Sequence, residues 1–217
     1  MPNLSQLKRQ RMLAFLDKIK EEHKTDDEML IALGEIANAL ISKKYGLVWE
    51  QHEEKVDVAI QTNIPVFTEV AEKEISLVSD GNYNFLLEGD NLHSLYLLEK
   101  THKGAIDLIY IDPPYNTGEE DFIYDDNYVD VNDSFRHSKW LSFMSVRLNI
   151  AKSLLAPHGF IFISIDDKEA SQLKMLCDEI FGENNYEKTD YIQVRYPEKT
   201  LKSDMKYHKE IEQVLIY

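Results

Sequence analysis

An aspartate, two prolines and a tyrosine follow directly after an apolar run. Asp112-Pro113-Pro114-Tyr115 comes immediately after residues 106–111, whose pattern predicts a buried strand. Ligands bind at the carboxyl ends of strands in open α/β sheets. The two prolines hold Asp112 and Pro113 in extended geometry, so the loop can keep its acceptors still. A carboxylate, a backbone carbonyl and a flat ring together suit a planar group that bears an NH2, such as a nucleobase taken out of the helix.

The elements that must position this motif alternate between strand and helix. Apolar periodicity predicts strands at 85–87, 106–111, 160–165, 191–196 and 213–217, and helices at 92–100, 134–155 and 168–181. Asp90 or Asn91 is expected to cap the first of these helices, and Asp166 or Asp167 the last. The alternation predicts an α/β fold with a largely parallel sheet and covering helices.

The first part of the chain has a different pattern. Between Leu4 and about Tyr45, apolar residues recur at helical spacing on both sides of a polar break, which predicts two helices with Thr25 or Asp26 capping the second. We therefore predict an N-terminal helical segment over residues 1–50, an irregular connection with at most one strand over 51–82, and an α/β domain over 83–217.

Composition sets limits on function. The chain has 217 residues, a formal net charge of −15 and one cysteine. A self-sufficient DNA-binding surface is normally basic, so this chain is not expected to hold DNA well alone. It has no apolar stretch long enough to cross a bilayer and no apolar signal core, so we expect a cytoplasmic protein. No Cys/His cluster has the spacing of metal ligands, and no metal is expected.

The segment Asp112 to Gly118, Asp-Pro-Pro-Tyr-Asn-Thr-Gly, resembles the catalytic motif of amino-group DNA methyltransferases. It is most similar to that of the adenine-specific modification subunits of type III restriction systems. Further stretches agree in order and spacing, namely residues 87–92, 122–126, 138–148 and 159–167. The resemblance covers roughly residues 64–217.

The resemblance implies a partial Rossmann-like methyltransferase fold, S-adenosylmethionine as the methyl donor and adenine N6 as the acceptor. It implies catalytic roles for Asp112, Pro113, Pro114 and Tyr115, cofactor contacts from Asp90, Asn91 and Asp112, and substrate contacts from Tyr115, Asn116, Phe122 and Tyr124. Such subunits act on double-stranded DNA, form homodimers and associate with a restriction subunit, so these partners are expected.

The chain also departs from the family pattern. It has eight glycines, none in a Gly-x-Gly arrangement, whereas the family carries a glycine-containing cofactor loop after its recognition region. We therefore expect an amino-terminal part of a methyltransferase that is inactive by itself. Three alternatives stay open: a cytosine-N4 enzyme, which Asp rather than Ser at position 112 disfavours; a non-catalytic assembly module; and another nucleotide-binding α/β protein.

Several side chains have two interpretations. Asp90 could contact the cofactor or only cap a helix, and Phe122 and Tyr124 could wall a base pocket or anchor their loop. Arg147 could contact a phosphate or form a structural ion pair, and His137 stays unassigned. Trp140, Phe143 and Met144 fit a helical core stripe and are not expected to be functional.

Overall fold

The computed structural model describes residues 4–41, 46–75, 84–118, 120–124, 127–194 and 211–217. They divide into two compact units, Met1–Gly46 and Leu47–Tyr217. The helices are α1 (Leu4–Glu22), α2 (Asp27–Ile41), α3 (Lys55–Thr62), α4 (Asn91–His102), α5 (Arg136–Leu154) and α6 (Ala170–Cys177), with short turns η1 (Ala71–Lys73), η2 (Asp178–Gly182) and η3 (Glu183–Asn185). The strands are β1 (Ile106–Ile111), β2 (Ile123–Tyr124), β3 (Asn127–Tyr128), β4 (Leu155–Ile165), β5 (Lys188–Gln193) and β6 (Ile211–Ile216).

The first unit is a pair of helices, as the sequence predicts. The amide of Met29 donates to Asp26 Oδ1 at 3.0 Å, so Asp26 caps α2. Leu16, Leu33 and Ala37 form the buried seam between the helices. Larger apolar side chains such as Phe15 and Ile31 are 62% and 64% exposed.

The second unit contains a four-stranded sheet in the order β1-β4-β6-β5. β1 and β4 are parallel, while β6 is antiparallel to both of its neighbours. The α/β class is confirmed. The sheet is mixed, with a smaller share of parallel pairing than expected, because β5 and β6 follow one another and pair directly instead of crossing over a helix.

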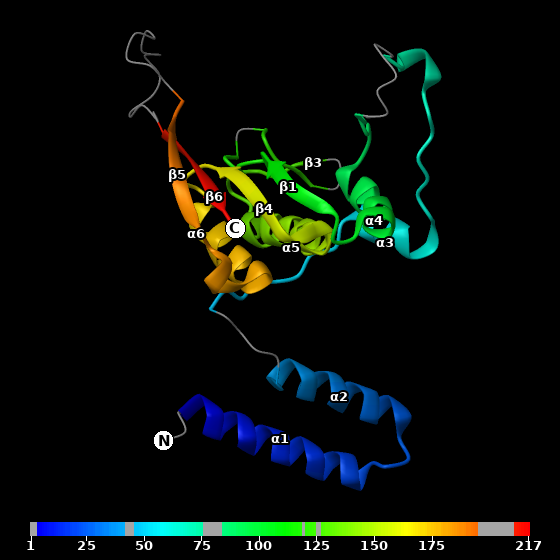
Figure 1. Cartoon of the computed structure of the whole chain (residues 1–217). Coiled ribbons are helices and arrows are strands. Elements are labelled where there is room, and N and C mark those ends of the chain that lie inside the picture. The colour runs from blue at the N-terminus through cyan, green and yellow to red at the C-terminus, as the bar shows by residue number, and fades with distance from the viewer. Residues whose placement is uncertain (1–3, 42–45, 76–83, 119, 125–126, 195–210) are drawn as a thin grey trace. The chain divides into compact units, whose positions relative to one another are not determined.

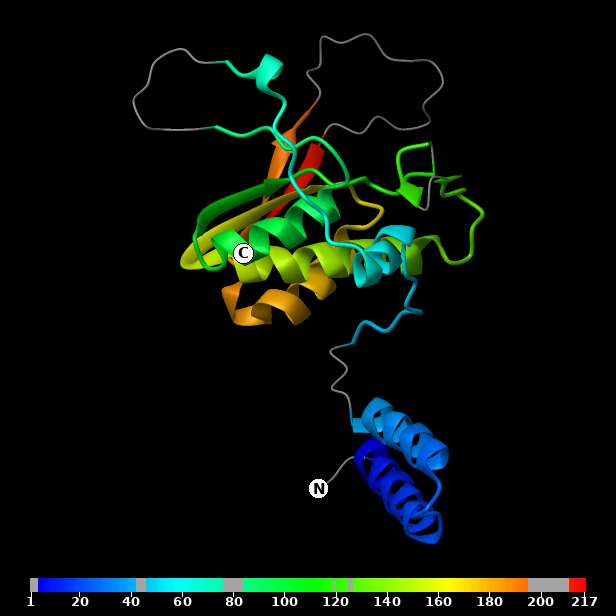
Figure 2. The same cartoon turned by 90° about the vertical axis from the view of Figure 1, so that its right-hand side faces the viewer.

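One face of this sheet is covered by helices. In both views α5 and α6 lie on the same side of the strands (Figures 1 and 2). β4 contributes Ile161, Ile163 and Ile165 at the two-residue period of a strand, and α5 contributes Trp140, Met144 and Leu148 at the four-residue spacing of one helical face; all six are buried in one core. This core supports the carboxyl end of β1, where the Asp112 loop begins.

Two expectations about secondary structure are wrong. Residues 84–88 form no strand, and Phe85 and Leu86 are 83% and 92% exposed, since no other described strand pairs with them. The connection after Gly46 contains the helix α3, where alternating apolar residues had suggested at most a strand. A reciprocal capping box between Glu54 and Asp57 begins this helix.

The remaining helices and the strands of the four-stranded sheet agree with the sequence apart from their bounds, whereas the short strands β2 and β3 were not predicted. β1 has the predicted range, whereas β4 begins at Leu155 and β5 at Lys188; the end of the predicted strand 191–196 lies outside the described residues. Within the part of the chain that the structure describes, no helix is long and apolar enough to span a bilayer.

Candidate active site

The loop after β1 brings its carboxylate and its aromatic ring together. The Tyr115 hydroxyl donates to Asp112 Oδ1 at 2.8 Å, and more weakly to Glu212 Oε2 at 3.4 Å. Asp112 is exposed and Tyr115 is half-buried. Burial, and then the hydrogen bond to Asp112, raise the pKa of the Tyr115 hydroxyl well above its usual value, so the hydroxyl keeps its proton and donates.

The second proline is held from the core. The Trp140 indole Nε1 donates to the Pro114 carbonyl at 2.7 Å, and Trp140 is fully buried. Trp140 was expected to be a core residue only, and the structure adds this contact to the loop. Pro113 itself is buried, and its carbonyl stays a predicted acceptor for the substrate amine.

Asn116 points into the protein. Its backbone is left-handed, with φ of 56°, and its side chain is fully buried. The amide Nδ2 donates to Glu169 Oε1 at 2.5 Å. In this structure Asn116 therefore anchors the loop and does not face a ligand. Gly118 (φ 82°) follows, where an added Cβ would lie only 2.6 Å from Val131 Cβ, so glycine is required.

Phe122 and Tyr124 also lie inside the fold. Phe122 is 1% exposed and Tyr124 is 7% exposed. The Phe122 ring packs edge-on against the Phe143 ring, with 5.3 Å between the ring centroids. Its centroid lies 6.1 Å from that of the Tyr124 ring. These rings anchor the loop between β1 and α5, which corresponds to the second of their two interpretations.

Asp90 and Asn91 form the start of α4. Asp90 Oδ1 accepts from the Leu92 amide at 2.8 Å, so Asp90 caps this helix as expected. Its side chain is nevertheless 44% exposed. Asn91 Oδ1 accepts from Arg147 Nε at 2.8 Å.

Arg147 is the centre of a buried polar cluster. Its Nη1 donates to Glu54 Oε2 at 2.6 Å and to the Phe143 carbonyl at 2.9 Å, and its guanidinium lies 3.5 Å above the Phe143 ring. Burial raises the pKa of Glu54, and the hydrogen bond from Arg147 opposes this rise. Arg147 is thus a structural ion-pair residue in this structure, which leaves it no exposed phosphate-binding role.

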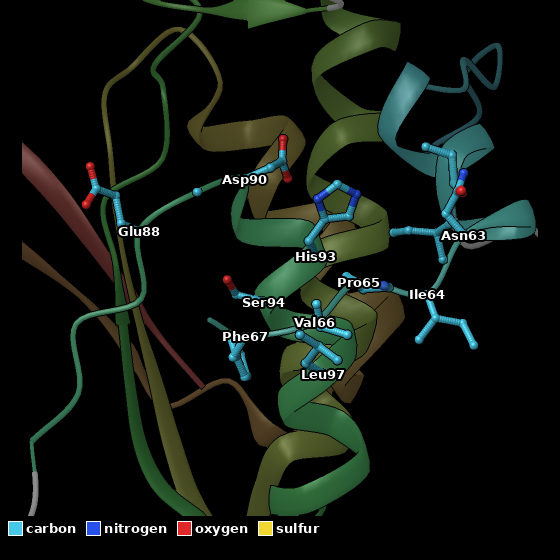
Figure 3. A pocket seen from close by; sticks show the side chains of 13 residues that line it. Asn63, Ile64, Pro65, Val66, Phe67, Glu88, Asp90, His93, Ser94 and Leu97 are labelled. Atoms are coloured by element: carbon cyan, nitrogen blue, oxygen red, sulfur yellow. The ribbon is translucent and has the colours of Figure 1, made fainter. Parts of the chain in front are cut away.

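Two pockets meet at the segment Gly89-Asp90. One of about 430 Å³ lies between α4 and the segment after α3, with Val66, Phe67 and Leu97 among its apolar residues (Figure 3). In this view His93 and Ser94 come from the same helix as Leu97. The other, of about 350 Å³, is bordered by Glu54, Asn91, Phe143 and Arg147. Asp112 lines neither pocket.

The two halves of the site are connected through α5. Trp140 holds the Asp112 loop and Arg147 holds the start of α4. Seven residues separate them, which corresponds to roughly 10 Å along a helix. The predicted catalytic and cofactor residues are therefore carried by loops that share one rigid support.

Comparison with known proteins identifies the family of the chain. Residues 106–217, which include β1, the Asp112 loop and the rest of the sheet, match the family described as DNA methylase, of the N6/N4 methyltransferase type. This chain belongs to the DNA methylase family.

Individual relatives match part of the chain. The chain is 50% identical over 115 residues to the probable type III restriction-modification enzyme HindVI Mod subunit of Haemophilus influenzae, covering 52% of this chain and 14% of the relative. It is 36% identical over 186 residues to the EcoP15I Mod subunit of Escherichia coli, covering 73% and 28%. It is 46% identical over 109 residues to the type II methyltransferase M.KpnI of Klebsiella pneumoniae, covering 49% and 26%. The chain thus spans between 14% and 28% of the length of these relatives.

One residue behind the Asp112 loop was not predicted from the sequence. Glu169 is fully buried and accepts from Asn116 and His137. The only available signal was a charged residue four positions after the end of β4, and that position is equally typical of an exposed helix start.

Proposed function

We propose that this chain is the catalytic part of an S-adenosylmethionine-dependent DNA methyltransferase that acts on adenine N6 in a restriction-modification system. The observation that carries the proposal is the pairing of Asp112 with the Tyr115 hydroxyl at the carboxyl end of β1, with Pro114 held by Trp140. Membership of the DNA methylase family supports the reaction class.

The chemistry of an exocyclic amine explains why this loop suits the reaction. The amine lone pair is delocalised into the base, so the nitrogen is a poor nucleophile until acceptors bind its hydrogens. Asp112 and the Pro113 carbonyl are the acceptors, and Tyr115 is the ring on which a flipped adenine stacks. No side chain needs to become covalently attached.

The residues near Asp90 fit the adenosyl part of the cofactor. Both described contacts of the Asp90 side chain use Oδ1, so Oδ2 can accept from a ribose hydroxyl or from an adenine amine. Apolar side chains of the adjoining pocket, including Val66 and Leu97, suit a purine ring. When bound, S-adenosylmethionine supplies the methyl group, and Asn91, held by Arg147, keeps the Asp90 turn in place.

DNA binding and assembly are further parts of the proposal. With a net charge of −15, this chain needs basic surfaces from elsewhere to grip double-stranded DNA. Two of the relatives are named as Mod subunits of type III restriction-modification enzymes, so we propose a restriction subunit as a partner and a homodimer as the assembly. Such an enzyme would act in the cytoplasm.

Cytosine N4 is the second candidate acceptor. The matched family includes enzymes of both the N6 and the N4 type, and both bases present an exocyclic NH2. Asp at position 112 is the feature that favours adenine.

Methyl transfer to DNA tests the proposal directly. The protein is expressed from the complete open reading frame that contains this chain, and incorporation of labelled methyl groups from S-adenosylmethionine is measured for wild type and for Asp112→Ala. We expect incorporation by the wild type and none above background by the variant, with equal melting temperatures. Equal incorporation by both proteins would reject the role of Asp112.

A further inference from the structure

A buried carboxylate lies directly behind the Asp112 loop and has no part in the chemistry described above. Glu169 follows β4 and immediately precedes α6, and its side chain is fully buried. Its Oε1 accepts from Asn116 Nδ2 at 2.5 Å and from His137 Nδ1 at 2.6 Å. Glu169 Oε2 and Asn116 Oδ1 are buried without a hydrogen-bond partner among the described residues.

Polar and charged side chains from several elements surround Glu169 and the residues that follow Tyr115. On α5, Arg136 Nε donates to His137 Nε2 at 3.2 Å, which makes Nδ1 the ring nitrogen that carries the hydrogen for Glu169. On the turn before α6, the amide of Lys168 donates to Asp166 Oδ1, and Lys168 Nζ reaches the Thr117 carbonyl at 2.8 Å. Asp121 accepts from the Thr117 and Gly118 amides. The residues after Tyr115 are therefore held from three sides.

Asn116 is the point at which this network meets the proposed catalytic loop. A left-handed backbone is unfavourable for residues other than glycine, and asparagine tolerates it better than most. Asn116 Nδ2 donates to Glu169 Oε1 at 2.5 Å and to the Arg136 carbonyl at 3.4 Å, so the bond to Glu169 is the stronger restraint on that side chain. Tyr115 precedes Asn116, so this conformation determines how the Tyr115 hydroxyl reaches Asp112.

We propose that Glu169 is a positioning residue for methyl transfer: by holding Asn116 in its left-handed conformation, it sets the placement of Tyr115 and Asp112 against the target amine. This inference rests on the proposed function. A buried carboxylate is costly, and an apolar side chain would fill the same space at lower cost. Burial also raises the pKa of Glu169, and the hydrogen bonds from Asn116 and His137 oppose the rise.

An exchange of donor and acceptor tests the pairing. Asn116→Asp alone places two carboxylates against each other, so we expect kcat for methyl transfer to fall on the order of 100-fold with little change in the KM for S-adenosylmethionine. In the double variant Asn116→Asp/Glu169→Gln, the amide introduced at position 169 donates to the carboxylate introduced at position 116, so the two carboxylates no longer repel each other. We expect most of the lost kcat to return.

Asp178→Asn is the matched control. Asp178 is also a buried carboxylate beyond β4, and it accepts from the Tyr217 hydroxyl at 2.6 Å and from Lys174, two residues that lie outside the loop. This variant is expected to keep the wild-type kcat even if it melts at a lower temperature. If Asp178→Asn loses as much kcat as Asn116→Asp, the loss reflects a general loss of stability and not the position of the loop. That result would overturn the inference.

A second measurement does not depend on activity. Amide hydrogen exchange over residues 115–118 is followed in the 217-residue chain, and we expect faster exchange in Asn116→Asp and recovery in the double variant. Recovery of protection together with an inactive wild-type enzyme would reject the proposed function and keep the structural pairing. An active wild type, with a folded double variant that recovers neither kcat nor protection, would reject the positioning role.

Discussion

Trp140 and Arg147 lie on the same side of α5, and each donates a hydrogen bond to a different loop of the candidate site. Trp140 Nε1 reaches the Pro114 carbonyl at 2.7 Å, and Arg147 Nε reaches Asn91 Oδ1 at 2.8 Å. A separation of seven residues returns a helix to nearly the same face and advances it by roughly 10 Å. One rigid element thus determines the spacing between the proposed substrate loop and the proposed cofactor loop.

Trp140→Phe tests the first of these contacts. The substitution keeps an aromatic ring in the core but leaves the part-buried Pro114 carbonyl without its donor, which costs about 1 kcal/mol of stability. We expect methyl transfer to fall on the order of 100-fold because the loop shifts. Steady-state kinetics and thermal melting measure the two effects.

Trp49→Phe provides the comparison for that variant. Trp49 Nε1 donates to Ser142 Oγ at 3.1 Å, on the same helix, and has no described contact with the Asp112 loop. It should lose stability without a matching loss of kcat. If both variants lose activity in proportion to stability, Trp140 has no special role in placing the loop.

Arg147 is expected to contribute strongly to the stability of the folded protein. Removing it leaves Glu54 buried without its cation, and both side chains are only 9% exposed. Arg147→Met should therefore lower the free energy of unfolding by about 3–5 kcal/mol. Adding Glu54→Gln should recover part of this loss, as measured by chemical denaturation. If the double variant is less stable than Arg147→Met alone, the buried charge of Glu54 does not depend on Arg147 for its stability.

The local parts of this structure could be predicted from the sequence, since they depend on neighbours in the chain. The strand before Asp112, the cap at Asp90 and the two N-terminal helices follow from periodicity and capping residues. The strand predicted at 85–87 failed because an apolar run forms a strand only where another strand pairs with it. The helix α3 was missed because residues 55–62 alternate in a way that is typical of strands.

The network behind the site could not be predicted, because its partners are distant in sequence. Glu169 is 53 residues from Asn116, and Arg147 is 93 residues from Glu54. Spacing carries no information about such contacts without a fold. The same limit explains why Asn116, Phe122 and Tyr124 were predicted to contact substrate, although all three are buried here.

The stability of the protein should depend on the protonation of Glu169. Burial raises the pKa of this carboxyl above the ordinary value of 4.5, so the folded state holds the proton more tightly than the unfolded state. The resulting stabilisation is complete below about pH 4.5 and is lost as the pH rises through the folded pKa. Relative to Glu169→Gln, the wild type should become less stable over that interval.

Denaturation of both proteins at several pH values measures this difference. The ionisable groups that face Glu169 are His137 and Arg136, so repeating the pair of measurements in a His137→Gln background removes the imidazole from the comparison. Dilute protein is needed, because the range includes the pI of about 4.8. A difference in stability that does not change with pH would show that Glu169 does not titrate differently in the folded state.

The ring and the hydroxyl of Tyr115 should make separable contributions. Tyr115→Phe removes the hydrogen bond to Asp112 and keeps the ring, whereas Tyr115→Ala also removes the stacking surface, worth about 1–3 kcal/mol in related base platforms. We expect the alanine variant to be the slower enzyme and to bind a flipped-base analogue more weakly. Equal binding of that analogue by both variants would exclude stacking on Tyr115.

The apolar side chains exposed on α1 and α2 are expected to take part in self-association. Phe15 is 62% exposed and Ile36 is 50% exposed, and a two-helix segment buries little apolar surface alone. Light scattering should show a dimer for the wild type and a shift to monomer for Phe15→Lys/Ile36→Lys. A variant that stays dimeric would place the dimer contact elsewhere. A monomeric wild type would exclude the dimer.

The identity of the methylated nucleoside is the most direct test of the central proposal. The protein from the complete open reading frame is incubated with DNA and labelled S-adenosylmethionine, and the DNA is then digested and its nucleosides are separated by chromatography. We predict that the label appears as N6-methyladenine. Label in N4-methylcytosine would contradict the adenine assignment of the Asp112 loop, and a folded protein that methylates neither base would contradict the proposed activity.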